Sequence, residues 1–209
     1  MEIQYYGGNC LKITTKKASV VVDDNLASLG AKSVTKEGDI ALFTGQHQAT
    51  NPKVRLLVDQ PGEYEVADVS IRGVAARAHI DEEGSRNATI YKVEAEDIRL
   101  AVVGHIDSGI TESQLEALGT VDILFIPVGG NGFTLDPVGA LKVIKEIEPK
   151  VIVPTQYAVP GLKYEVPAQE LEEAIKVLAM EPKERVPKLK LKGADGFTDQ
   201  AQLIILERQ

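Results

Sequence analysis

The stretch that most constrains the fold is residues 121–128, VDILFIPV, the most apolar run of the chain. A run of this kind is typical of a strand that is buried on both faces of a sheet. A second buried-type run, 98–103, precedes it, and Thr-Glu-Ser-Gln at 111–114 resembles a capping box that starts a helix. Amphipathic helices are predicted from Asp136 onward and over 167–180. Strands alternating with helices in this way predict a layered α/β fold.

The first half of the sequence consists of short apolar runs separated by turn residues. Runs at 3–6 and 11–15 flank Gly-Gly-Asn at 7–9, which is a strong turn signal. A valine-rich run at 19–23 ends in two acids. We see no internal repeat, low-complexity segment or linker, so we expect one domain over residues 1–209.

The composition fits a globular protein with an aliphatic core. Hydrophobic residues make up 44% and charged residues 26%, whereas aromatic residues make up only 5%, with no Trp. The net charge of −8 argues against nonspecific binding to nucleic acid, whose phosphates need a basic surface. Lys188, Lys190 and Lys192 alternate, which an exposed strand face explains more simply than a basic patch.

The sequence favours a reducing compartment. Cys10 is the single cysteine, which excludes an intramolecular disulfide. The first residues show no basic region followed by an apolar run, and no apolar stretch approaches the roughly 18 residues that span a bilayer. We therefore expect a cytoplasmic protein that does not associate with membranes.

Several segments, in their order and spacing, resemble one family of enzymes. IQYYGGNCLKI with SVVVDD, then LVDQPGEYEVADVSIRGVAARAH, then LAVVGHIDSGITESQLEALGTVDILFIPVGG and VIVPTQY resemble small metal-dependent hydrolases of the metallo-β-lactamase superfamily, similar to ascorbate-6-phosphate lactonase. The resemblance covers roughly residues 1–160. It implies a four-layer αββα sandwich, in which two mixed sheets lie face to face with helices outside. It also implies metal ligands on loops at one edge.

The metal-binding motif of that family is largely replaced in this chain. Where the family carries Thr-His-x-His-x-Asp-His, residues 44–50 read TGQHQAT. His47 is retained in this register, whereas Gly45, Ala49 and Thr50 replace two histidines and the aspartate. The family's further ligands correspond to His79 or a neighbour of it, to His105 in place of a bridging aspartate, and to Gln156 in place of the closing histidine.

Two hypotheses about metal follow from these substitutions. A catalytic zinc has three protein ligands and an open position for water. If His47, His79 and His105 converge, they could hold one Zn, Mn or Fe ion, and Asp107 could serve as the base. A second ion is not expected, because its carboxylate and histidine ligands are missing. The sequence favours the other hypothesis, in which the metal site is lost and no cofactor is bound.

Other residues are candidates for binding a ligand. The loop Gly129-Gly130-Asn131-Gly132 could offer backbone N–H groups to an anion, but it lacks the lysine and spacing of a P-loop, and a tight connection explains it more simply. By resemblance, this loop, Asp24 and Gln156 lie near the family's substrate cleft. His105, Asp107 and Ser108 include the residue types of a hydrolase triad, but such triads converge from separate elements. The candidate ligand-binding residues are Asp24, Gly129, Gly130, Asn131 and Gln156.

These features lead to one favoured function and two alternatives. We favour a degenerate, non-catalytic family member that binds a small molecule or a protein partner, and family analogy suggests a homo-oligomer. The first alternative is a mononuclear metal-dependent hydrolase of an ester, lactone or phosphoester. The second, a nuclease or RNA-processing factor, is disfavoured by the acidic charge and the low aromatic content.

Overall fold

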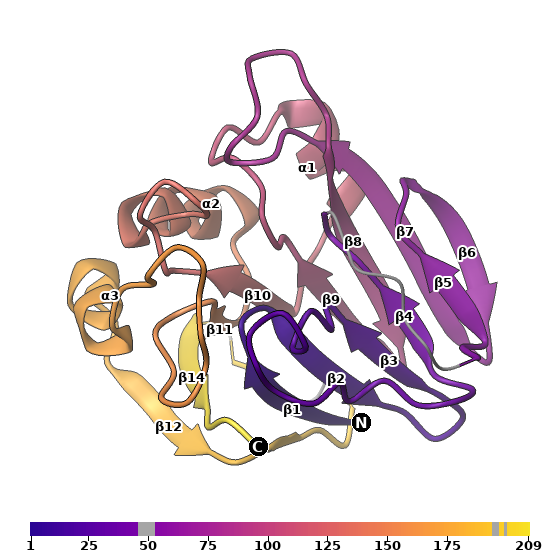
Figure 1. Ribbon diagram of the computed structural model, residues 1–209. Helices are drawn as coiled ribbons and strands as arrows, with labels where there is room; N and C mark the ends of the chain where they lie inside the picture. Colours follow the sequence, from indigo (N-terminus) through magenta and orange to yellow (C-terminus); the bar gives the residue numbers. More distant parts are fainter. Residues whose placement is uncertain (46–52, 194–196, 199) are drawn as a thin grey trace.

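Two β-sheets face each other in the computed structural model, which describes residues 1–45, 53–193, 197–198 and 200–209 (Figure 1). The smaller sheet has the strand order β13-β1-β2-β3-β4-β5. Its first four strands are antiparallel, whereas β3, β4 and β5 run parallel. The strands are β1 (Glu2–Gly7), β2 (Cys10–Thr14), β3 (Ser19–Val22), β4 (Ile40–Leu42), β5 (Leu56–Val58) and β13 (Leu189–Lys190).

The larger sheet has the order β12-β14-β11-β10-β9-β8-β7-β6. The strands from β12 to β9 are parallel, and those from β9 to β6 are antiparallel. The strands are β6 (Gly62–Val66), β7 (Val69–Ala76), β8 (Ala88–Ala95), β9 (Ile98–Val102), β10 (Ile123–Pro127), β11 (Val151–Thr155), β12 (Pro182–Val186) and β14 (Gln202–Leu206).

Three helices follow successive parallel strands of the larger sheet. They are α1 (Glu112–Leu118) after β9, α2 (Pro137–Ile147) after β10 and α3 (Leu171–Leu178) after β11. The predicted capping box is present, because Thr111 and Gln114 bond each other's backbone N–H groups. Asp136 caps α2. The prediction of a helix over 167–180 is wrong at its start, because the backbone of Gln169 instead bonds Gly129 and Ala158.

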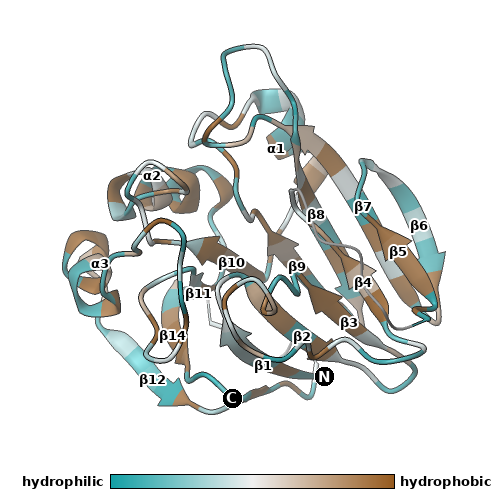
Figure 2. Ribbon diagram, viewed as in Figure 1, coloured by the Kyte–Doolittle hydropathy of each residue, from teal (hydrophilic) through white to brown (hydrophobic). Residues whose placement is uncertain are grey.

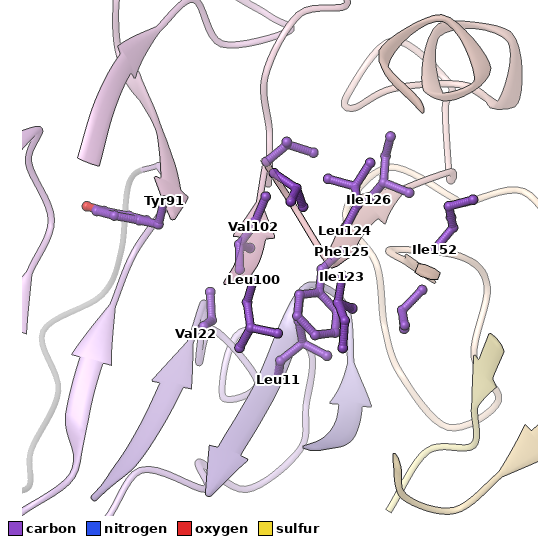
Figure 3. Close-up of a cluster of buried hydrophobic side chains, with 14 of the residues drawn as sticks. Leu11, Val22, Tyr91, Leu100, Val102, Ile123, Leu124, Phe125, Ile126 and Ile152 are labelled. Atoms are coloured by element: carbon purple, nitrogen blue, oxygen red, sulfur yellow. The ribbon is translucent and has the colours of Figure 1, made fainter. Parts of the chain in front are cut away.

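The inner faces of the two sheets form the main core. Leu11 and Val22 point from the smaller sheet toward Leu100 and Ile123 of the larger one (Figure 3). Every residue of β10 and β11 is buried, as their continuous apolar sequences predict. Figure 2 shows the opposite pattern in the outermost strands β6 and β12, which are largely hydrophilic and so discourage further strand pairing.

The outer layers of the sandwich differ. The larger sheet carries the helices, with α1 against β7 and α2 against β10. On the smaller sheet, a second apolar cluster forms where Leu26, together with half-buried Leu29 and Val34, packs on Cys10 and Val21. Two mixed sheets thus lie face to face as expected, whereas in the described residues a loop segment, and not a helix, covers this outer face. No helix in the described part of the chain is long and apolar enough to cross a membrane.

Candidate functional site

A cavity of about 450 Å³ lies where the carboxyl ends of the parallel strands from both sheets meet. Connections after β3, β4, β9 and β11 reach this edge, as does the turn between β1 and β2. Ligand sites in parallel α/β sheets form at such carboxyl edges. The polar and small residues that these connections place on its wall include Asn9, Asp23, Gly45, Ala78, His105 and Gln156.

His105 reaches the cavity because the chain turns sharply after β9. Gly104 has φ +54°, and a Cβ there would overlap the side chain of Thr44, so only glycine suits this turn. The ring of His105 meets Phe133 edge-on, with centroids 5.4 Å apart and planes at 76°. Burial lowers the pKa of His105, and the nearby charge of Asp23 opposes this only in part. The imidazole is therefore neutral at pH 7.

The side-chain amide of Asn9 determines how the His105 ring can bond. Thr155 donates its hydroxyl to Asn9 Oδ1 at 2.7 Å, which turns the NH₂ group toward His105. Asn9 Nδ2 lies 3.4 Å from His105 Nε2. In this arrangement Nε2 accepts, so Nδ1 carries the ring proton of the neutral histidine. In this tautomer a metal on His105 would have to displace the Asn9 NH₂ group.

Asp23 ties together the ends of two strands at the base of the cavity. It has φ +46° and is buried. Its carboxylate accepts the backbone N–H of Thr44 at 2.7 Å and the Thr44 hydroxyl at 2.6 Å. The ends of β3 and β4 are thereby fixed immediately before Gly45, the last described residue of this loop.

Gln156 closes the cavity at the end of β11. Its backbone has φ +52° and donates an N–H to the carbonyl of Gly8 at 2.7 Å, which connects the two sheets. The residue is only 6% exposed and lines the cavity. Within the described part of the chain, no hydrogen bond is formed by its side-chain amide. This amide is therefore available to a ligand.

His79 and Asp107, two further residues of the predicted metal site, lie beside the cavity rather than on its wall. His79 donates its backbone N–H to the His105 carbonyl at 2.8 Å, but its neighbour Ala78 lines the cavity. Asp107 pairs with Arg77 at 2.6 Å. Burial raises the pKa of Asp107, but bonds from the Gly109 N–H and from Arg77 outweigh this and leave it lowered. A carboxylate with a lowered pKa is a weak base.

The predicted ligand-binding residues other than Gln156 mainly shape the backbone. Asp24 accepts four bonds on Oδ2, from Ser33, from the backbone of Val34 and from the backbone and hydroxyl of Thr35. It therefore orders this loop, and the neighbouring Asp23 lines the cavity instead.

The glycine-rich loop after β10 makes its own hydrogen bonds. A Cβ on Gly129 would overlap the carbonyl oxygen of Gln156. Gly130 donates its N–H to the Leu135 carbonyl, and Asn131 donates its side-chain NH₂ to Pro167. The carboxylate of Asp136 occupies the helix N-terminus that follows, which disfavours an anion there. Phe133 is the residue of this segment that reaches the cavity.

Sequence reasoning missed most of the described wall, including Asn9, Phe133 and Tyr164. Tyr164 accepts the N–H of Gly8 at 3.4 Å and donates to the Tyr157 carbonyl at 2.9 Å. The only sequence signal was the position of Asn9 in the Gly-Gly-Asn turn.

The described residues do not fit a catalytic metal. A catalytic zinc needs three protein ligands, and the described ranges contain no group of three His, Cys, Asp or Glu side chains that could hold an ion. His105 is the one histidine among the described wall residues, and its Nε2 lies 3.4 Å from Asn9 Nδ2. His47, Ala49 and Thr50 lie outside the described residues.

Known proteins with the same fold are similar to this chain over most or all of its length. The family model of the β-lactamase superfamily domain matches residues 2–156. A candidate Zn-dependent hydrolase of the metallo-β-lactamase superfamily from Thermotoga maritima is similar over 100% of this chain and 99% of its own, with 25% identity and a TM-score of 0.80. A candidate metal-dependent hydrolase from Parabacteroides distasonis shares 16% identity over 99% of this chain and 93% of its own, with a TM-score of 0.67.

A further structural match is to a protein named as a diiron enzyme. A diiron β-hydroxylase from Streptomyces venezuelae shares 12% identity over 85% of this chain and 49% of its own, with a TM-score of 0.58. The matched family model covers most of the sequence, including every strand from β1 to β11. The chain belongs to the metallo-β-lactamase superfamily.

Proposed function

We propose that this protein has lost most metal ligands of its superfamily and binds a small molecule in the cavity without hydrolysing it. The observation that carries the proposal is the contact of His105 Nε2 with the side-chain amide of Asn9 at 3.4 Å, on the face of the ring where a metal would be held. An amide, Gln156, stands at the closing ligand position of the family pattern, and Gly45 and Ala78 offer no metal-binding side chain.

The shape of the cavity suits a bound molecule. Ligand pockets typically measure about 300–1,000 Å³ and combine apolar walls with a few convergent polar groups. This cavity has a volume of about 450 Å³. The apolar side chains of Leu29 and Phe133 lie on its wall together with the amides of Asn9 and Gln156.

Metal analysis tests the proposal. Tag-free full-length protein is purified without chelator, challenged separately with Zn²⁺, Mn²⁺ and Fe²⁺, desalted and measured by elemental analysis. We expect well below about 0.3 equivalents of each metal, because a stable site needs about three ligands. A stoichiometric metal that disappears in His47→Ala would contradict the proposal.

A mononuclear metal-dependent hydrolase is the second candidate. It is favoured by the position of Gly45, the residue at the family's first histidine position, because a Cβ there would lie 3.8 Å from His105 Nδ1. The neighbours named as metal-dependent hydrolases also support it. It requires about one bound ion per chain and turnover of an ester, lactone or phosphoester that the His47→Ala substitution abolishes.

The remaining predictions concern assembly and location. We propose a cytoplasmic protein, and a homo-oligomer or a complex with a protein partner on family analogy. Light scattering coupled to gel filtration measures the first of these assemblies directly. A mass equal to one chain, 22.6 kDa, would exclude the homo-oligomer.

A further inference from the structure

We infer that the cavity selects an uncharged or positively charged ligand that carries an amide-type edge, with a donor and an acceptor side by side, and that it rejects anions. This inference rests on the proposed binding function and specifies its ligand class. Three independent features support it: the charge of the wall, the free amide of Gln156 and the apolar surface around Phe133.

The charged residues on the described wall are all acidic. They are Asp23, Asp81 and Glu165, and no Lys or Arg of the described residues lines the cavity. The residues outside the description that follow Gly45, 46–52, contain neither Lys nor Arg in their sequence. A cleft with charges of one sign and low-dielectric walls concentrates the opposite charge and repels its own. Among the described wall residues an anionic ligand would also find no Lys or Arg as a partner.

Asp81 contributes a permanent negative charge. Its carboxylate accepts bonds from the side chain of Asn87 at 3.0 Å and from the backbone of Ala78 at 3.0 Å. The hydrogen bond from the Asn87 side chain is the main cause that lowers the pKa of Asp81. The group is therefore ionised at neutral pH, and its field extends into the cavity that Ala78 and Asn87 also line.

The side-chain amide of Gln156 is the group that would bond the amide-type edge of the ligand. This amide lines the cavity and is bonded by no other described group, so it can bond a ligand directly. The amide offers one carbonyl acceptor and an NH₂ donor in one plane. A second amide pairs with both groups of such an edge, whereas a protonated amidine has donors only and bonds its carbonyl oxygen. A carboxylate has two acceptors, so it can bond the NH₂ group but faces the carbonyl oxygen of Gln156 with a like charge.

The remaining wall is apolar and suits a flat body attached to that edge. Phe133, held edge-on by His105, lines the cavity together with Leu29 and Val166. Ile80, at the mouth, is 67% exposed.

Three fragments of the same shape test the ligand class: benzamide (neutral), benzamidine (cationic) and benzoate (anionic). Each is titrated into ¹⁵N-labelled full-length protein, and the side-chain amides of Asn9 and Gln156 are followed by NMR. We expect benzamide and benzamidine to bind in the cavity with dissociation constants at least about tenfold lower than that of benzoate. The advantage of benzamidine over benzamide should shrink at high salt.

Matched variants separate the contribution of the Gln156 amide from that of the acidic wall. Gln156→Met keeps the length of the side chain but removes the edge, so benzamide should bind about tenfold more weakly. Gln156→Asn retains an amide and tolerates positive φ, but draws the edge back by one carbon, and should weaken benzamide in the same direction. Glu165→Gln should reduce the preference for benzamidine over benzoate, whereas Glu37→Gln, at an exposed glutamate outside the wall, should not.

Two results would overturn the inference. If benzoate binds in the cavity as tightly as benzamide, the ligand class is wrong while the proposed binding function stands. If none of the three fragments shifts the cavity resonances, the inference also fails, and the metal analysis described above decides the proposed function separately.

Discussion

Two polar side chains at opposite ends of the parallel strands β9, β10 and β11 differ in their hydrogen bonding. At the amino end, Asp122 is fully buried and accepts from the backbone and guanidinium of Arg99 at 2.8–2.9 Å and from Lys150 at 3.3 Å. At the carboxyl end, the side-chain amide of Gln156 has no partner among the described residues. Asp122 therefore stabilises the fold at the amino end, whereas the amide of Gln156 at the carboxyl end is available to a ligand.

The largest expected effect comes from the amino end. Asp122→Ala leaves Arg99 and Lys150 without their shared partner, and we expect a loss of about 3 kcal/mol in the free energy of unfolding. Urea denaturation measures it. Gln156→Ala at the carboxyl end should cost less than half as much, because no bond in the described residues is broken. Equal losses would remove the contrast between the two ends.

The same contrast predicts an acid dependence of stability. Burial raises the pKa of Asp122, but bonds from Arg99 and Lys150 outweigh this and lower it below its ordinary 3.8. A lowered pKa means that the stabilisation is complete above about pH 4 and is lost as the pH falls through the lowered value. The slope of stability against pH below about pH 4 should therefore decrease in Asp122→Asn.

The next effect concerns the close approach of backbones at the cavity. Gly129→Ala places a methyl group on the Gln156 carbonyl, and we expect a loss of about 2–3 kcal/mol together with weaker ligand binding. Gly132→Ala, in the same loop, has open space and only a backbone cost at φ +75°, about 1 kcal/mol. Thermal unfolding of the two variants should rank them in this order, and the reverse order would show that the loop is not packed against β11 as described.

The smallest effect concerns His105. Burial lowers its pKa below the ordinary 6.5, so the folded state favours the neutral ring. This contribution is complete above about pH 6.5 and is lost as the pH falls through the lowered pKa. In stability measurements, wild type should lose up to about 1 kcal/mol more than His105→Gln between pH 7 and 5. A His79→Gln variant controls for the loss of a histidine outside the cavity wall.

Much of the fold could be predicted because its signals are local. The apolar run at 121–128 contains β10, and the Thr111 capping box marks α1 as expected. The helix predicted over 167–180 begins only at Leu171, since backbone bonds from Gln169 to Gly129 and Ala158 involve residues far away in the sequence. Local patterns do not report such long-range pairing.

The site was less predictable for the same reason. Family resemblance led to His105 and Gln156, which line the cavity. Asn9 could not be found in this way, because its role depends on a contact with His105, 96 residues away. The choice between Asp23 and Asp24 depends on a turn with positive φ at Asp23, which a valine-rich run followed by two acids does not specify.

The ring of His105 offers the most direct test of the central claim. Long-range ¹H–¹⁵N NMR of full-length protein at pH 7.5, with and without equimolar Zn²⁺, reports which nitrogen carries the proton and whether either binds a metal. The account predicts a neutral ring protonated on Nδ1 that zinc leaves unchanged. A zinc-induced shift of a His105 nitrogen, lost in His47→Ala, would contradict it and establish a metal site.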